Sequence, residues 1–276
     1  MTARLIWDIE PNQGWFNMAA DHYLALNYAG SNFDCIVRFY TWEPSAVSLG
    51  CNQDPGIIDL ERCIENGWDL VYRPTGGRAL LHSGDLSYSV IFRNLENPLA
   101  KLRWLYQQIE LAIKETVRAF GVIPDTKHDF TKAPNAESRP LRKDLCMTSL
   151  VRGEVTYEGR KFTGAAQHVY QDSLLQHGSI ALKTTPSAIA EVMSVEESVR
   201  QAMRHKLDQE SMSLAEIYAE ITHMDFTLTM KRNLIDSLSL KVQEIEIQDD
   251  ETSGITSLRE DFELLSAPRK HAGILV

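Results

Sequence analysis

The chain has 276 residues, of which 43% are hydrophobic and 24% are charged. This balance is typical of a folded globular protein and excludes a disordered chain, because it supplies enough apolar side chains to bury a core. The length corresponds to one large domain or two small ones. With 28 basic and 38 acidic residues the net charge is −10, which argues against general nucleic-acid binding because that requires a basic surface.

The sequence carries no signal for a membrane or for secretion. No stretch approaches the roughly 20 apolar residues of a membrane span, and Asp8 interrupts the N-terminal segment too early for a secretory signal. The four cysteines, Cys35, Cys51, Cys63 and Cys146, form no C-x-x-C pair. A disulfide framework or a zinc site is therefore not expected. We expect a cytoplasmic protein without a metal site, in which each thiol is either buried or reactive.

Taken in chain order, the first 120 residues alternate between helical and extended patterns. Hydrophobic periodicity, β-branched residues and the Gly and Pro positions set the boundaries. The expected elements are a helix at 15–28, strands at 35–42 and 46–49, a short helix at 59–65, extended segments at 68–73, 78–82 and 86–92, and an amphipathic helix at 99–120.

The second half begins with a long polar loop at 124–144, of a length that is often functional. Glu158-Gly159 has the composition of a hairpin turn between two strands. The expected elements are strands at 146–157, 161–169 and 179–182, then helices at 187–193, 196–203, 214–224 and 230–242, with no clear element from 243 to 276.

These elements predict an α+β fold, with a mixed β-sheet first and helices later. We expect one domain over 1–245, which becomes helical from about residue 186. The remaining residues, 246–276, form a C-terminal tail to which the sequence assigns no role.

Residues 73–82, Arg-Pro-Thr-Gly-Gly-Arg-Ala-Leu-Leu-His, are the first segment with a chemical signature. Adjacent glycines leave backbone N–H groups accessible to an oxyanion or a carbonyl oxygen, and Arg73 and Arg78 could hold a phosphate or a carboxylate. The alternative is a Gly-Gly hairpin with solvent-facing arginines, which is the more common meaning of such a pair. Nothing in the segment decides the role of His82.

Residues 159–167, Gly-Arg-Lys-Phe-Thr-Gly-Ala-Ala-Gln, place a lysine beside a strand of small side chains. Gly164, Ala165 and Ala166 leave room for a ligand or another backbone, and Lys161 could direct its ammonium group into that space. A lysine beside a turn is otherwise a solvated surface residue. His177, within Gln-His-Gly-Ser at 176–179, is either a site residue or part of a turn.

Cys146 opens a predicted strand directly after the charged loop that contains Arg139, Arg142 and Lys143. Nearby cations stabilise a thiolate, so a cysteine that faced Lys161 across the hairpin would be a usable nucleophile. The alternative is a buried, inert thiol. Strand register cannot be fixed from the sequence, so it does not decide whether the two side chains meet.

Three segments in this order resemble the lipoate–protein ligase and octanoyltransferase family, which is related to the biotin–protein ligases. Residues 73–82 resemble the family pattern R-x-[ST]-G-G-R-A-x-x-H, residues 159–167 resemble G-[RK]-K-[IVF]-[AST]-G-[STA]-A-Q, and residues 175–179 resemble L-x-H-G-[ST]. The resemblance extends over about 15–182 and implies the mixed-sheet catalytic fold of that family.

Two features resemble the cysteine-type octanoyltransferase branch of this family: an arginine after the paired glycines, and Cys146 fifteen positions before Lys161. The resemblance implies that Cys146 takes an octanoyl (or lipoyl) group from acyl carrier protein and passes it to a lysine of a lipoyl-domain or glycine-cleavage H-type protein. It makes Lys161 the contact to the acyl carbonyl and requires no cofactor. It also implies a set of substrate-binding residues: Arg73, Gly76, Gly77, Arg78, His82, Gly164, Ala165, Gln167, His177 and Gly178.

Two other functions remain open. An ATP-dependent lipoate–protein ligase would form lipoyl-AMP with ATP and Mg²⁺, and a binding module for a lipoylated partner would have no catalysis at all. Tyr72 and Ser83 stand where the family often has an arginine and an acidic residue, which favours thioester over adenylate chemistry. Acyl carrier proteins are acidic, so a carrier would have to dock on a local basic patch, for which Arg139, Arg142 and Lys143 are candidates. We expect neither nucleic-acid nor membrane partners.

Overall fold

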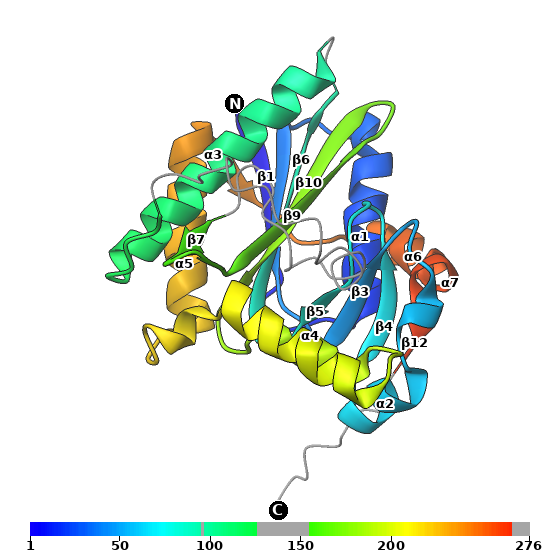
Figure 1. The fold of residues 1–276 in the computed structure, drawn as a ribbon. Coiled ribbons are helices and arrows are strands. Elements are labelled where there is room, and N and C mark those ends of the chain that lie inside the picture. Colours follow the sequence, from blue (N-terminus) through cyan, green and yellow to red (C-terminus); the bar gives the residue numbers. More distant parts are fainter. Residues whose placement is uncertain (95–96, 126–154, 267–276) are drawn as a thin grey trace, which may run out of the picture.

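The computed structural model describes residues 1–94, 97–125 and 155–266, which form two mixed β-sheets surrounded by helices (Figure 1). The larger sheet has six strands, in which β1 runs parallel to both of its neighbours and the pairs from β2 onward are antiparallel. In spatial order the strands are β11 (Lys241–Glu244), β1 (Thr2–Trp7), β2 (Cys35–Tyr40), β6 (Asp85–Arg93), β10 (Ser173–Ala181) and β9 (Thr163–Val169).

The smaller sheet has four strands and contains the segment before and after the paired glycines. Its order is β12 (Glu263–Leu265), β4 (Asp69–Arg73), β3 (Ala46–Gly50) and β5 (Leu80–His82). A separate hairpin joins β7 (Thr156–Tyr157) to β8 (Arg160–Lys161). Its two turn residues, Glu158 and Gly159, both have positive φ, 50° and 75°, which confirms the predicted hairpin turn.

Helices cover both faces of the larger sheet, with α3 and α5 on one side and α1 on the other (Figure 1). This explains why every residue of β2 is buried: Val37 and Phe39 pack with α3 and α5, and Ile36 packs with α1. The α-helices are α1 (Gly14–Leu26), α2 (Leu60–Asn66), α3 (Pro98–Ala119), α4 (Glu197–Glu210), α5 (His223–Leu238), α6 (Asp249–Ser257) and α7 (Arg259–Phe262). Four short 3₁₀ helices complete the described elements: Tyr28–Gly30, Pro55–Ile57, Pro186–Val192 and Leu214–Glu216.

Helix α1 also contacts the smaller sheet, so it joins the two halves of the core. Trp15, Met18 and Ala19 pack in one cluster with Ala46 of β3 and Val71 of β4. The side chains of α1 that face both sheets therefore border the space between them, where the candidate site lies.

The α+β fold and the elements expected up to residue 120 are confirmed, although β1 (Thr2–Trp7) was not expected. Several predictions for the second half are wrong. The strand expected at 179–182 begins at Ser173, and the helix expected at 214–224 is only a 3₁₀ turn at Leu214–Glu216. The helix expected at 230–242 begins at His223, because Thr222 caps it by accepting a hydrogen bond from the Asp225 N–H. The loop expected at 124–144 and most of the strand expected at 146–157 lie outside the described residues.

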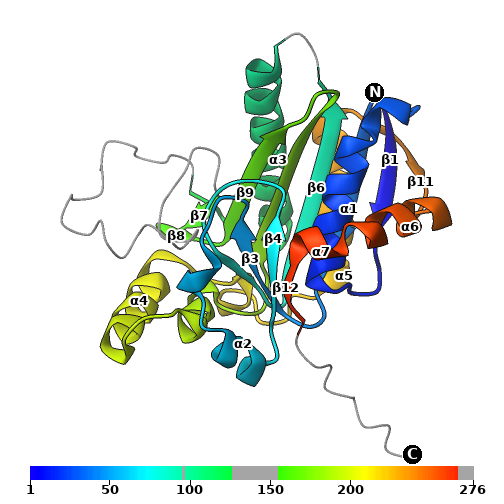
Figure 2. The same cartoon turned by 90° about the vertical axis from the view of Figure 1, so that its right-hand side faces the viewer.

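The largest correction concerns the C-terminal segment, for which no element was expected after residue 243. Strand β11 begins at Lys241, where the expected helix at 230–242 was still to run, and pairs with β1, while β12 pairs with β4. Between them α6 and α7 pack on α1 (Figure 2). The two strands were missed because their hydrogen-bond partners are more than 190 residues away in the chain, beyond the reach of any local pattern. Within the described residues, no helix is long and apolar enough to cross a membrane.

Candidate functional site

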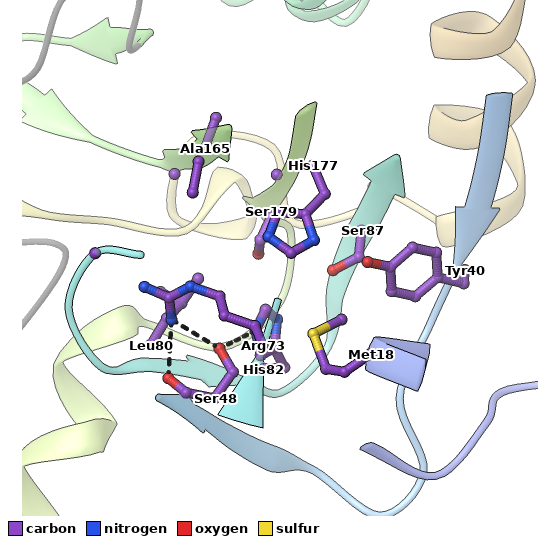
Figure 3. Close-up of a pocket in the computed structure, with 14 residues that line it drawn as sticks. Met18, Tyr40, Ser48, Arg73, Leu80, His82, Ser87, Ala165, His177 and Ser179 are labelled. Atoms are coloured by element: carbon purple, nitrogen blue, oxygen red, sulfur yellow. Dashed lines mark hydrogen bonds between the residues drawn. The ribbon is translucent and has the colours of Figure 1, made fainter. Parts of the chain in front are cut away.

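A pocket between the two sheets collects residues from all three motif segments. It encloses about 430 Å³ of empty space, counted out to open solvent. Seven of the predicted substrate-binding residues line it: Arg73, Gly77, His82, Gly164, Ala165, His177 and Gly178. The other lining residues are Met18, Tyr40, Ser48, Leu80, Ser87, Ala166 and Ser179 (Figure 3).

Strands β9 and β10 contribute several small residues to the pocket lining, alongside His177 and Ser179. Gly178 lies opposite Ala165 in the strand pair. A Cβ atom at Gly178 would lie 2.5 Å from the Tyr88 hydroxyl and 2.7 Å from the Gly164 carbonyl oxygen. A larger residue at this position would therefore displace Tyr88 or the backbone of β9, so the close packing beside the pocket requires glycine.

The paired-glycine segment forms a loop that is held by the buried guanidinium of Arg73. Its Nη2 donates to the carbonyl oxygens of Gly76 (3.0 Å) and Arg78 (2.8 Å), and its Nη1 donates to the Ser48 carbonyl (3.1 Å). Gly77 has φ of 102°, and a Cβ atom there would lie 2.7 Å from Arg73 Nη2. Arg73 therefore shapes the loop with the same guanidinium that the sequence suggested for an anionic ligand, and the loop is not a simple solvent-facing hairpin.

His82, at the end of β5, is the centre of a buried polar chain in the pocket wall. Its Nδ1 lies 2.9 Å from Asp85 Oδ2, and its Nε2 lies 2.9 Å from the Ser48 hydroxyl. The ring of Trp42 stacks on the imidazole with a centroid distance of 3.9 Å. Burial opposes the ionisation of Asp85, but the charge of His82 and hydrogen bonds from His82 and two serines lower its pKa below the ordinary value. The carboxylate is therefore charged and orients the imidazole.

His177, on β10, has the same arrangement with other partners. Its Nδ1 lies 3.0 Å from Asp21 Oδ2 and its Nε2 lies 2.7 Å from the Thr75 hydroxyl. Asp21 also accepts from Arg38 (3.1 Å) and from the Tyr40 hydroxyl (2.9 Å). Although burial opposes it, the hydrogen bond with His177 and the charge of Arg38 lower the pKa of Asp21, whereas burial lowers the pKa of His177. An uncharged imidazole beside a charged carboxylate is the result.

Four predicted site residues do not line this pocket. Gly76 and Arg78 belong to the loop around Gly77, while Gln167 donates from Nε2 to the Leu102 carbonyl and to Gln176, away from the cavity. Lys161 is 1% exposed, so it is not the solvated surface lysine that a position beside a turn would suggest. Cys146 and the nearby Arg139, Arg142 and Lys143 lie outside the described residues.

Several polar residues of the site were not singled out from the sequence. The imidazole of His177 is held by Asp21. The imidazole of His82 is held by Asp85 and by the Ser48 hydroxyl. The useful signal was the acidic residue inside the otherwise apolar stretch of α1, where Asp21 is 0% exposed, because an unpaired buried carboxylate is costly and implies a partner. No group of three or more metal-ligating side chains that could hold an ion occurs among the described residues.

The chain is similar to known proteins in sequence and in fold. The model of the lipoyl protein ligase A/B catalytic domain matches residues 13–235. The chain is 29% identical over 240 residues to octanoyltransferase LipM of Anoxybacillus flavithermus, which covers 86% of both chains. It is 31% identical over 205 residues to octanoyltransferase LipM of Geobacillus kaustophilus, which covers 73% of this chain and 74% of the relative.

Solved structures support the fold. A bipartite lipoate protein ligase of Thermoplasma acidophilum superposes with a TM-score of 0.75 at 20% identity, over 94% of this chain and 92% of that chain. A lipoate-protein ligase A bound with ATP superposes with a TM-score of 0.71 at 20% identity, over 94% of this chain and 95% of that one. At this level of identity the likeness establishes the common architecture.

Proposed function

Because the chain belongs to the lipoyl protein ligase A/B catalytic-domain family, we propose that it is an octanoyltransferase of lipoate biosynthesis. The observation that carries this proposal is the convergence of the three motif segments on one pocket with glycine and alanine in its wall. The curated relatives named octanoyltransferase LipM, which match most of the chain, support the same activity.

The pocket suits a linear, apolar acyl chain. Met18 and Leu80 supply apolar surface (Figure 3), and Gly164, Ala165 and Gly178 add little bulk to the lining. At about 0.8 kcal/mol for each buried CH₂, roughly seven methylene-sized groups of an octanoyl chain contribute several kcal/mol of binding. Burial of the chain also fixes the position of its carbonyl group relative to the protein.

The proposed chemistry uses two thioester steps and requires no ATP. The Cys146 thiolate attacks the octanoyl carbonyl of the carrier thioester, a new C–S bond forms, and the carrier thiolate leaves with the electron pair of the old one. Lys161 stabilises the thiolate and the developing oxyanion, and its burial supports this role because an ammonium group acts more strongly where water is excluded. The second step is transfer to an amine, which is downhill because an amide replaces a thioester.

The donor and acceptor follow from the same proposal. The donor is an octanoyl-loaded acyl carrier protein, and the acceptor is the lysine of a lipoyl domain or of a glycine-cleavage H-type protein. Since both this chain and a typical carrier protein are acidic, docking requires a local basic surface, for which Arg139, Arg142 and Lys143 are the candidates.

Intact-mass spectrometry after incubation with octanoyl carrier protein tests the proposal. We expect a gain of one octanoyl group that hydroxylamine removes and that the Cys146→Ser variant does not form. Lys161→Ala is expected to lower kcat strongly with the fold intact, whereas the matched control Lys183→Ala, at an exposed lysine, leaves kcat unchanged. Release of pyrophosphate from lipoate and ATP, with no acyl adduct, would instead establish the lipoate–protein ligase.

A further inference from the structure

The pocket contains a hydroxyl, an imidazole and a carboxylate connected in sequence. Ser48 Oγ lies 2.9 Å from His82 Nε2, and His82 Nδ1 lies 2.9 Å from Asp85 Oδ2. Ser48 and His82 both line the pocket (Figure 3). With Asp85 ionised, Nδ1 carries the imidazole proton, so Nε2 accepts the proton of the Ser48 hydroxyl. These three hydrogen-bonded side chains are thus arranged to move a proton from the pocket toward His82.

The charges around this chain favour that direction. Arg73 Nη1 donates to Ser48 Oγ at 3.2 Å, which makes the hydroxyl a better proton donor toward His82. At the other end, Asp85 Oδ2 accepts from His82, Ser87 (3.1 Å) and Ser179 (2.5 Å). Asp85 Oδ1 is buried without a hydrogen-bond partner within the described chain. A buried carboxylate with one unsatisfied oxygen is costly, and a positive charge on His82 would offset that cost.

The second imidazole is less suited to the same task. His177 contacts Thr75, but Thr75 does not line the pocket, so the hydroxyl at His177 Nε2 is not offered to a ligand there. The hydroxyl that contacts His82 therefore belongs to a pocket residue, whereas the hydroxyl that contacts His177 does not.

We propose that Ser48 and His82 take the proton from the acceptor lysine when it attacks the octanoyl thioester, and that Asp85 positions His82 and stabilises its charge. This inference rests on the proposed octanoyltransferase function. It supplies the base that the transfer step needs, because a lysine amine with an ordinary pKa of about 10.4 arrives protonated at neutral pH.

The step balances as follows. One proton of the acceptor ammonium passes to Ser48 Oγ while the Ser48 proton passes to His82 Nε2. The freed nitrogen electron pair forms the C–N bond, and the C–S bond breaks with its electron pair on sulfur. A second nitrogen proton goes to that sulfur, which leaves an amide and a thiol. His82 then returns its proton to solvent.

The test separates transfer to a lysine from transfer to a nucleophile that needs no base. Octanoyl-enzyme is formed from octanoyl-N-acetylcysteamine and isolated, and its decay is then followed with a purified lipoyl domain or with hydroxylamine, which is already uncharged at neutral pH. For Ser48→Ala and His82→Asn we expect transfer to the lipoyl domain to slow by about 10²–10⁴-fold. Hydroxylamine cleavage and the loading step should change less than about threefold.

Two further variants serve as controls. Ser45→Ala removes a hydroxyl that bonds only to Ser83 among its described contacts and lies outside the pocket, so transfer should be unchanged. Thr75→Val breaks the corresponding contact at His177 and should affect both nucleophiles alike.

Three outcomes would overturn the inference. Ser48→Ala is the milder change. If it slows transfer to the lipoyl domain and cleavage by hydroxylamine equally, or slows neither, then Ser48, His82 and Asp85 have only a structural role. If Thr75→Val alone shows the selective loss, His177 is the base. If the wild-type protein forms no octanoyl-enzyme, the proposed function fails and this inference fails with it, and that result is recognised before any variant is compared.

Discussion

At the residue scale, the paired-glycine loop depends on a mutual fit between Gly77 and Arg73. The positive φ of Gly77 is a conformation that side chains rarely adopt, and its missing Cβ leaves room for the guanidinium that binds the two flanking carbonyls. The loop, the arginine and the adjoining pocket wall are therefore one structural unit, in which a change at any member reaches the pocket.

The Gly77→Ala variant is expected to lose stability and transfer activity together. A methyl group would force Arg73 to give up its bonds to the Gly76 and Arg78 carbonyls and would strain the backbone by about 1–3 kcal/mol. Urea unfolding and the rate of octanoyl transfer measure the two effects. Gly76→Ala is the matched control, because nothing lies within 4 Å of a Cβ there; an equal loss in both variants would contradict the explanation.

Sequence reasoning located these residues but misjudged their surroundings. Lysine and arginine side chains near turns are usually exposed to solvent. Arg73 and Lys161 are nevertheless only 6% and 1% exposed. The motifs identified seven pocket residues because they are short and contiguous. The carboxylates that hold the histidines, Asp21 and Asp85, come from separate elements, so only the folded chain shows their pairing.

The buried imidazole of His177 predicts a pH dependence of stability. Because burial lowers its pKa in the folded state, the unfolded chain binds the proton more readily. The stabilising effect of the uncharged ring is fully present above the unfolded pKa, near 6.5, and is lost as the pH falls through the folded pKa. Replacing His177 with Asn should therefore flatten the fall in the free energy of unfolding below about pH 6.5.

Urea unfolding at several pH values between about 5 and 7.5 measures this slope. Burial also lowers the pKa of His22 and of His223, so part of the slope should remain in the variant. His205→Asn, at an exposed position of α4, is the control and should leave the slope as in the wild type. A slope that is identical with and without His177 would show that its protonation is not linked to folding.

At the element scale, local patterns predicted elements well where packing and pattern agree. The helices α1 and α3 and the strands β2, β3 and β6 have strong periodicity or β-branched runs, and they form close to the expected bounds. The short helix α6 begins Asp-Asp-Glu-Thr-Ser-Gly, a sequence with low helix propensity. A capping box between Gln248 and Glu251 supports its first turn. The helix also packs on α1, and its glycine is part of that contact.

Gly254→Ala in α6 is expected to destabilise the protein, although the same change would stabilise an isolated helix. Alanine normally stabilises a helix interior by about 1 kcal/mol relative to glycine, but here its Cβ would lie 2.2 Å from the ring of Tyr23 on α1. We expect a net loss of about 1–3 kcal/mol from overpacking in urea unfolding. In a Tyr23→Ala background the same change should become stabilising, and a loss that persists there would refute the contact as its cause.

At the scale of the whole molecule, the C-terminal segment connects the two sheets. Its strand β11 pairs with β1 of the larger sheet, and its strand β12 pairs with β4 of the smaller sheet. Between these strands, α6 and α7 lie across α1 (Figure 2). Helix α1 carries Met18, which lines the pocket, and Asp21, which bonds to the pocket residue His177, so the segment after residue 240 supports the site from behind. No local pattern predicted this, because β11 and β12 each pair with a strand more than 190 residues earlier in the chain.

The ion pair between Arg4 and Glu251 fixes this connection, and its removal gives the last prediction. Arg4 donates to both carboxylate oxygens of Glu251, at 2.6 and 2.7 Å, and to the Ile245 carbonyl at 3.1 Å. Because Arg4 is 8% exposed, Glu251→Gln leaves a largely buried guanidinium without its counter-charge. We expect a loss of about 1–3 kcal/mol in urea unfolding, together with faster amide hydrogen exchange in α6.

A second ion pair in the same segment provides the control, since it joins the same residue types in contact with solvent. Arg259 and Glu263 are paired with the arginine side chain 45% exposed, and such pairs contribute about 0–1 kcal/mol. Glu263→Gln should therefore change stability by less than Glu251→Gln, and its small effect should decrease further with salt. Equal effects of the two changes would mean that the position of α6 depends on apolar packing against α1 rather than on the charge of Glu251.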